Sequence, residues 1–109
     1  MAKFVKGDVV VIPFPFSDLS GSKRRPALVL ADLPGDDIIL CQITSQQYSD
    51  TFSVPLTSSD FDTGSLPVKS NIRPARIFTA DKNIIIKKSG AIKKSVALNV
   101  TQILIKLIS

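Results

Sequence analysis

Short apolar runs separated by turn-forming residues constrain the fold of this chain more than any other sequence feature. Each run is too short for a stable helix, and its β-branched side chains favour a strand. Several short strands with turns at roughly 8–12-residue intervals are typical of a small β-barrel or sandwich. We therefore expect a mainly β fold, a small barrel closed by a C-terminal helix, in a single domain spanning residues 1–109. The runs predicted to form strands are residues 9–12, 26–32, 38–44, 52–56, 75–79 and 84–86.

Residues with strong turn chemistry indicate how these strands connect. Residues 34–37, with the sequence Pro-Gly-Asp-Asp, predict a hairpin between the second and third strands. Pro55 lacks a backbone donor, which places its strand near an edge of the sheet. Residues 57–64 are polar and acidic and are predicted to form one capped helical turn. Residues 87–90, Lys-Lys-Ser-Gly, are predicted to form a turn after the last strand.

The C-terminal stretch is predicted to form a helix, with Ser95 as its N-cap. Apolar residues recur at helical spacing across residues 96–107. Further apolar residues, among them Leu98, Ile105 and Ile108, widen this stripe well beyond one narrow face. A helix that is apolar over so much of its circumference needs cover on more than one side. In a chain this small, a second subunit is a reasonable source of that cover, so we expect a homodimer.

Three consecutive cations precede the second strand and mark a candidate site. Lys23, Arg24 and Arg25 follow a polar loop at residues 17–22, and Pro26 biases Arg25 toward an extended backbone. The Arg25 guanidinium is therefore expected where a loop meets a rigid sheet, a place that suits a group that holds or polarises a phosphate. In the alternative interpretation, Lys23 and Arg24 form a solvated turn and Arg25 pairs with an Asp.

Charge is unevenly distributed along the chain, whose net charge is +5. Residues 1–63 hold five Lys or Arg and eight Asp, whereas residues 64–109 hold nine Lys or Arg and only Asp81. Such a basic half favours binding of nucleic acid; in the alternative interpretations it binds an acidic protein partner or serves only solubility. The chain has neither His nor Glu, which excludes the usual imidazole acid–base pair.

The chain carries no signal for export or membrane insertion. Its single Cys41 excludes a disulfide framework. The first residues contain no apolar signal region, and no apolar run approaches the ~20 residues that a membrane span needs. We therefore expect a cytoplasmic protein with no membrane partner.

Several short motifs occur in a set order along the chain. They lie at residues 7–10 (Gly-Asp-Val-Val), 21–30 (Gly-Ser-Lys-Arg-Arg-Pro-Ala-Leu-Val-Leu), 43–46 (Ile-Thr-Ser-Gln), 70–72 (Ser-Asn-Ile) and 77–82 (Ile-Phe-Thr-Ala-Asp-Lys). In order and spacing, these motifs resemble those of the MazF/PemK toxin family. The final apolar helix is similar as well, so the resemblance spans most of the chain.

This resemblance implies an SH3-like barrel that forms a homodimer. It implies a metal-independent endoribonuclease that cleaves single-stranded RNA, such as mRNA, at short sequences. It also implies a toxin of a type II toxin–antitoxin system, blocked by a cognate antitoxin whose disordered tail lies over the RNA groove. Arg25 and Thr44 match the positions that act in cleavage in that family. The residues expected to bind RNA are Asp18, Lys23, Arg24, Ser45, Gln46, Arg73 and Arg76.

Cleavage of RNA without a metal uses the 2′-OH as the nucleophile, leaves a 2′,3′-cyclic phosphate and requires charge stabilisation on the phosphoryl oxygens. Arg25 can supply this stabilisation with a bidentate fork, and Thr44 with a hydroxyl donor. Thr44 could instead bond only to backbone, Asp18 could be an Asx-turn residue, and Gln46 could be a solvated strand end. No Cys, His and carboxylate residues occur at metal-ligand spacing, so we expect neither a metal nor a cofactor.

Basic residues of the C-terminal half are expected to form a broad phosphate-binding surface. In the alternative interpretation they are solvated cations, or intramolecular partners of the Asp-rich first half. These residues are Arg73, Arg76, Lys82, Lys87 and Lys88.

Two other classes of function stay open on the sequence alone. The chain could be a non-catalytic, toxin-like dimer that inhibits a protein target such as a topoisomerase, or a plain SH3-like binding module. Cleavage of RNA without added metal separates the endoribonuclease from both.

Overall fold

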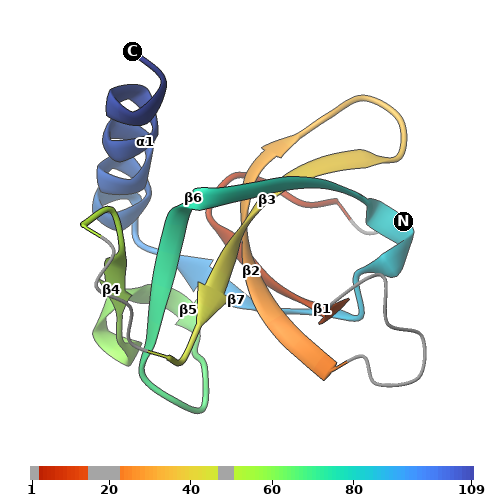
Figure 1. Ribbon diagram of the computed structural model, residues 1–109. Coiled ribbons are helices and arrows are strands. Elements are labelled where there is room, and N and C mark those ends of the chain that lie inside the picture. The colour runs from red at the N-terminus through yellow and green to blue at the C-terminus, as the bar shows by residue number, and fades with distance from the viewer. Residues whose placement is uncertain (1–2, 15–22, 47–50) are drawn as a thin grey trace.

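The computed structural model describes residues 3–14, 23–46 and 51–109. Within these ranges seven strands form one sheet of antiparallel pairs in the order β4-β6-β3-β2-β1-β7-β5, and one α-helix follows (Figure 1). The elements are β1 (Asp8–Phe14), β2 (Lys23–Asp32), β3 (Asp37–Thr44), β4 (Val54–Leu56), the single-turn 3-10 helix η1 (Ser58–Asp60), β5 (Phe61–Gly64), β6 (Ser70–Asp81), the 3-10 turn η2 (Lys82–Ile84), β7 (Lys87–Ile92) and α1 (Lys94–Ile108).

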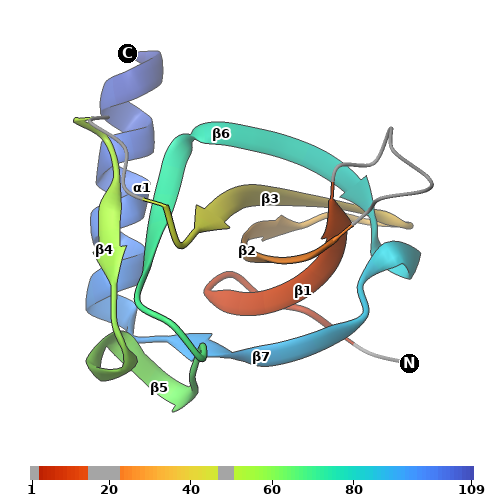
Figure 2. The ribbon, with the colours of Figure 1, turned by 60° about the horizontal axis from the view of Figure 1, so that its bottom comes forward.

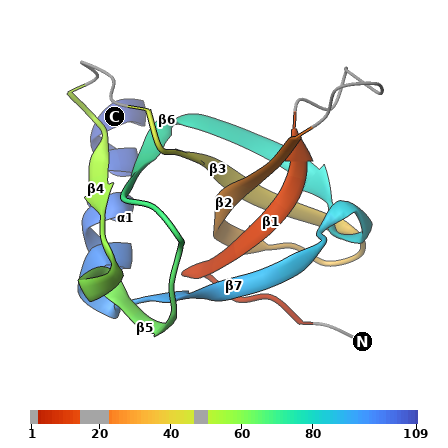
Figure 3. The same ribbon diagram turned by 90° about the horizontal axis from the view of Figure 1, so that it is seen from below.

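The sheet curls strongly, so that its strands enclose a partly open barrel (Figures 2 and 3). The helix α1 lies along one side of this barrel, next to β4 and β6 (Figure 2). The mainly β fold predicted from the sequence, a small barrel with a C-terminal helix, is confirmed.

Most of the predicted strands are present, and several are longer than expected. β2 begins at Lys23 rather than at Pro26, because β1 offers a paired backbone as far as the partners Phe14 and Lys23. The predicted hairpin at residues 34–37 joins β2 to β3. Pro55 lies in β4 at one edge of the sheet, as expected.

The predictions for residues 84–90 are wrong. Ile84 ends the turn η2, and residues 87–92 form β7 instead of a turn. Turn-forming composition is overridden here because β7 pairs with two strands, β1 and β5. Gly90 serves this pairing rather than a turn: a Cβ there would lie 2.3 Å from the Thr63 carbonyl oxygen.

The predicted C-terminal helix is present, but Ser95 is not its N-cap. The N-cap is Lys93, which makes no capping hydrogen bond with its side chain. Instead, the Lys93 backbone N–H donates to the Asp60 carbonyl at 2.8 Å, and the Lys93 carbonyl accepts from Val96 and Ala97. The contact with Asp60 therefore fixes where the helix begins. No helix in the described part of the chain is both long and apolar enough to cross a membrane.

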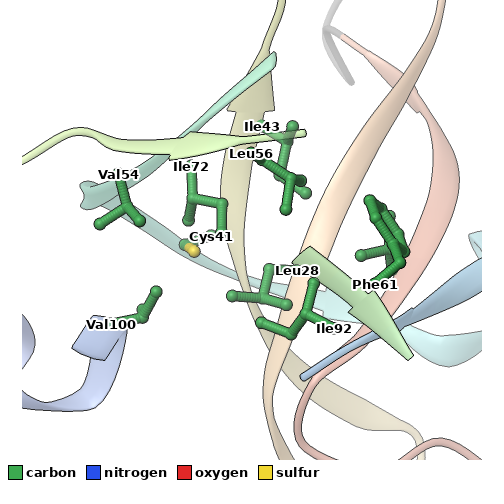
Figure 4. Packing of buried hydrophobic residues seen from close by; sticks show 10 residues of the cluster. Leu28, Cys41, Ile43, Val54, Leu56, Phe61, Ile72, Ile92 and Val100 are labelled. Carbon is green, nitrogen blue, oxygen red and sulfur yellow. The ribbon is translucent and has the colours of Figure 1, made fainter. Parts of the chain in front are cut away.

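Two hydrophobic clusters make up the core of the described ranges. The larger joins the sheet to α1, and Val100 of the helix points toward Cys41 of β3 (Figure 4). The smaller gathers side chains of β1, β2, β3 and β6, including Ile12 and Leu40. Burial raises the pKa of the Cys41 thiol from 9.0 to about 12, so the thiol stays protonated and unreactive at neutral pH. The thiol ionises at a lower pH in the unfolded chain than in the folded protein. The free energy of unfolding therefore decreases as the pH rises from about 9 toward 12.

Two lysines of the basic half form ion pairs with aspartates of the first half. Lys88 of β7 lies 3.1 Å from the carboxylate of Asp8, which is 1% exposed and also accepts a hydrogen bond from the Val5 backbone. Lys82 lies 2.9 Å from Asp32 and donates to the carbonyls of residues 33 and 35. The interpretation as intramolecular partners therefore holds for these two lysines.

Gly90→Ala should destabilise the protein strongly. The added methyl group would meet the backbone of β5, which cannot yield as a flexible side chain does. We expect a loss of roughly 3 kcal/mol in the free energy of unfolding, at the upper end for overpacked sites. As a control, Gly35→Ala adds a methyl in open space at a φ of +78°, and should lose only about 1 kcal/mol. Denaturant unfolding measures both, and equal losses would contradict the close approach of β5 and β7.

Lys88→Met should destabilise the fold because it leaves the buried Asp8 carboxylate without its cation. Lys88 is 47% exposed, so we expect about 2 kcal/mol, between the values for surface and fully buried pairs. The matched control is Lys87→Met, which removes the same charge from the neighbouring residue and should change stability by less than about 0.5 kcal/mol. Thermal or denaturant unfolding tests the difference. The ion pair would be unimportant if the two variants were equally stable.

Candidate active site

A pocket of about 360 Å³ opens where β2 and β3 approach β7 and the connection between β5 and β6. Figure 3 shows that connection running from β5 to β6, beside the beginning of β1. The residues that line the pocket come from segments far apart in sequence: Val11, Arg24, Arg25, Pro26, Ile43, Thr44, Ser45, Leu66, Pro67, Val68, Ser70, Lys87 and Ser89.

The two residues predicted to act in cleavage, Arg25 and Thr44, line this pocket together. The ladder between β2 and β3 ends at the pair Ala27 and Gln42, and Arg25 and Thr44 each lie two residues beyond that pair on their strands. Arg25 is half-buried and is held in β2 by pairing with Ile12 of β1. The sheet thus fixes the position of both residues, as a preformed site requires.

Thr44 is nearly buried at the end of β3. Its Oγ1 accepts a hydrogen bond from the Gln46 backbone N–H at 3.2 Å. This is a bond to the backbone, as in the alternative interpretation in which Thr44 bonds only to backbone. Since a hydroxyl can accept and donate at the same time, this bond does not use its donor. The bond therefore orients Thr44 and leaves it able to donate to a ligand oxygen.

The pocket has a cationic and an apolar part. Arg24, Arg25 and Lys87 supply the positive charge, and no described Asp is among the lining residues. The apolar part comes from residues 66–68 and is held in place by Ser70, whose Oγ donates to the Val68 carbonyl at 3.0 Å. An anion attached to an apolar group fits such a surface.

The other residues predicted to bind RNA from the first and second motifs are placed differently. Ser45 lines the pocket, whereas Gln46 and Lys23 are exposed and lie outside its described lining. The Gln46 carbonyl accepts from the Asn71 side chain at 3.3 Å, which ties the end of β3 to β6. Asp18 and the polar loop at 17–22 lie outside the described residues.

Arg73 and Arg76 are on β6 and do not belong to the described lining of the pocket. Arg73 is partly buried, and its Nη1 donates to Oε1 of Gln42 at 3.5 Å. Arg76 is exposed. It lies in an irregular stretch of β6, since Arg73 pairs with Gln42 while Ile77 pairs with the adjacent Cys41. Strand β3 lies between β6, which carries these two arginines, and β2, which carries Arg25.

Several lining residues were not predicted from the sequence to line this site: Leu66, Pro67, Val68, Ser70 and Ser89. Lys87 was expected on a broad phosphate-binding surface, without a place beside Arg25. Lys87 and Ser89 were assigned to a turn; alternation along a strand would have placed them on one face. The segment 66–68 carries no chemical signal, and only its packing reveals its place. Within the described ranges, no three His, Cys, Asp or Glu side chains lie close enough together to hold a metal ion.

The chain is similar to toxins of known structure along nearly its whole length. It is similar to MazE-MazF from Deinococcus radiodurans, with 19% identity, a TM-score of 0.77 and coverage of 100% of this chain and 98% of that chain. MazF from the same organism gives 22% identity, a TM-score of 0.75 and coverage of 99% and 98%. An endoribonuclease in complex with its cognate antitoxin, from Mycobacterial species, gives 14% identity, a TM-score of 0.76 and coverage of 97% and 95%.

At these identities the solved structures establish the fold of the chain. A search of curated proteins finds no match. A sequence model of the family described as PemK-like, MazF-like toxin of type II toxin-antitoxin system matches residues 5–108. This match covers almost the entire chain and confirms the resemblance seen in the motifs. The chain therefore belongs to the PemK-like, MazF-like toxin family of type II toxin–antitoxin systems.

Proposed function

We propose that this chain is a metal-independent endoribonuclease that cleaves single-stranded RNA and acts as the toxin of its toxin–antitoxin pair. One observation carries the proposal: Arg25 and Thr44, the two residues implicated by the motifs, line one pocket with two further cations. Similarity to an endoribonuclease of known structure supports it at the level of the fold.

The pocket suits one nucleotide unit of an RNA strand. A phosphate fits the cationic part, where the guanidinium of Arg25 can bind two oxygens at once and Thr44 can donate to one of them. The ribose and base then face the apolar segment 66–68. Phosphate contacts of this kind are independent of sequence, so the choice of cut site depends on base contacts elsewhere on the strand.

Cleavage in this pocket proceeds by attack of the 2′-oxygen on the adjacent phosphorus. A bond forms between the 2′-oxygen and phosphorus while the bond to the 5′-oxygen breaks, and the products are a 2′,3′-cyclic phosphate and a 5′-OH. The 2′-OH loses its proton and the leaving 5′-oxygen gains one. Arg25 and Thr44 stabilise the negative charge that develops on the phosphoryl oxygens, which is the largest contribution expected from a site without imidazole.

The partners proposed for this chain are RNA, a cognate antitoxin and a second copy of the chain. The pI of about 9.6 favours both RNA and an acidic antitoxin segment, which would compete for the same cations. The solved complexes of MazE-MazF and of the mycobacterial endoribonuclease with its antitoxin support an antitoxin as a partner. A cytoplasmic location follows from these partners.

Purified protein should cleave a long single-stranded RNA in the presence of EDTA and leave 2′,3′-cyclic phosphate ends. Arg25→Ala should lower the cleavage rate by about 10²–10³-fold, the cost of removing one donor to a developing oxyanion. Gel analysis of the RNA and end-group analysis of the products measure both. Lys94→Ala is the control, because it removes a cation from the exposed start of α1, outside the pocket lining.

The outcome separates the endoribonuclease from the other functions. Cleavage only with added metal, or products with a 3′-OH, would overturn the mechanism. No cleavage under any condition would favour a non-catalytic toxin or a binding module. Near-wild-type cleavage by Arg25→Ala would remove Arg25 from the active site.

The protein should form a homodimer in solution, covering the apolar face of α1. Leu98, Ile105 and Ile108 of this helix are 58%, 56% and 82% exposed, whereas Val100 is buried against the sheet. Sedimentation at micromolar concentration should show a species of twice 11.8 kDa. Ile105→Lys should shift the protein toward the monomer because it places a charge on that face. A monomer in the unmodified protein would contradict the proposal.

A further inference from the structure

Lys87 occupies a defined position in the pocket, on the far side of β1 from the arginines. Val11 of β1 pairs with Pro26 of β2 on one side and with Lys87 of β7 on the other. All three residues line the pocket, so they form one row across the sheet. Two strand spacings separate β2 from β7, about 10 Å. Lys87 therefore faces the ligand space from a different side than Arg24 and Arg25.

The neighbouring lysines are already engaged within the chain, whereas Lys87 is not. Lys88 pairs with the buried Asp8, and Lys82 with Asp32 and two carbonyls. Among the described residues Lys87 makes no ion pair, and it is exposed. Of the basic residues of β7, Lys87 is thus the one whose charge can be used by a ligand in the pocket.

Three cations around one pocket repel each other unless an anion lies between them. No described carboxylate lines the pocket to relieve that repulsion. A backbone phosphate of single-stranded RNA has the negative charge that would relieve this repulsion, and it is small enough to lie between the three cations. The flexible Lys stem lets the ammonium adjust to it as a point charge, while the arginines bind with a fixed geometry.

We propose that Lys87 is a phosphate-binding residue of this site, holding an RNA phosphate from the β7 side while Arg24 and Arg25 hold it from β2. That the ligand is an RNA strand rests on the proposed function. That Lys87 binds a phosphate rests on its place in the lining of the pocket. Lys87 contributes charge rather than proton transfer, so an arginine at position 87 should replace it.

The experiment compares Lys87→Gln and Lys87→Arg with the control Lys94→Gln, which removes a charge from the exposed start of α1. Affinity for an RNA carrying 2′-O-methyl groups throughout, which cannot be cleaved, is measured against salt concentration. Lys87→Gln should flatten the slope of log K against log salt by about 0.7, the value for one phosphate contact on a single strand. It should also lower cleavage of ordinary RNA about tenfold. Lys87→Arg and Lys94→Gln should leave both nearly unchanged.

A second readout is independent of cleavage. Titration with inorganic phosphate, followed by NMR, should shift the amide signals of Arg25, Thr44 and Ser89, and Lys87→Gln should weaken this binding while Lys94→Gln should not. Unchanged phosphate affinity in Lys87→Gln, or an effect equal to that of Lys94→Gln, would overturn the assignment. Phosphate binding that depends on Lys87 in a protein that does not cleave RNA would support the assignment and overturn the proposed function instead.

Discussion

The pairing of β1 with two neighbours, β2 on one side and β7 on the other, is the constraint on which the rest of the structure depends. It brings the cationic stretch that begins β2 and the lysines of β7 to the same end of the sheet. It also places the buried Asp8 beside Lys88. Because antiparallel neighbours fix each other's register, the faces of both flanking strands are set by β1. A site assembled around this strand needs no large rearrangement to present its charges.

Burial decides how the charges of this chain are used. The excess of Asp in the first half and of Lys and Arg in the second does not lead to two separate surfaces. Lys88 and Lys82 neutralise Asp8 and Asp32 across the fold, at positions where an unpaired charge would be costly. The cations of the pocket are left without a described carboxylate among its lining residues. Arg24, Arg25 and Lys87 are thus left available where the first motifs lie.

The helix α1 connects stability with assembly. One side of it packs against the core through Val100, where the Cys41 thiol is buried deeply enough to stay protonated. Its other side leaves the large apolar residues Leu98, Ile105 and Ile108 exposed, and apolar residues gathered on an exposed surface mark an interaction site. The same element can therefore stabilise one barrel and join it to a second.

The family motifs singled out Arg25 and Thr44, whose roles in cleavage stay a prediction. The class of fold, the hairpin at residues 34–37 and the edge strand with Pro55 could be predicted from the sequence alone. These follow from local signals: periodicity, turn chemistry and short motifs. Three features could not be predicted in this way: residues 87–92 form a strand, Lys87 lines the pocket while Lys88 pairs with Asp8, and the helix begins after Lys93. Each of these depends on a partner distant in sequence, since strand pairing and burial are non-local and can override the composition of a short segment.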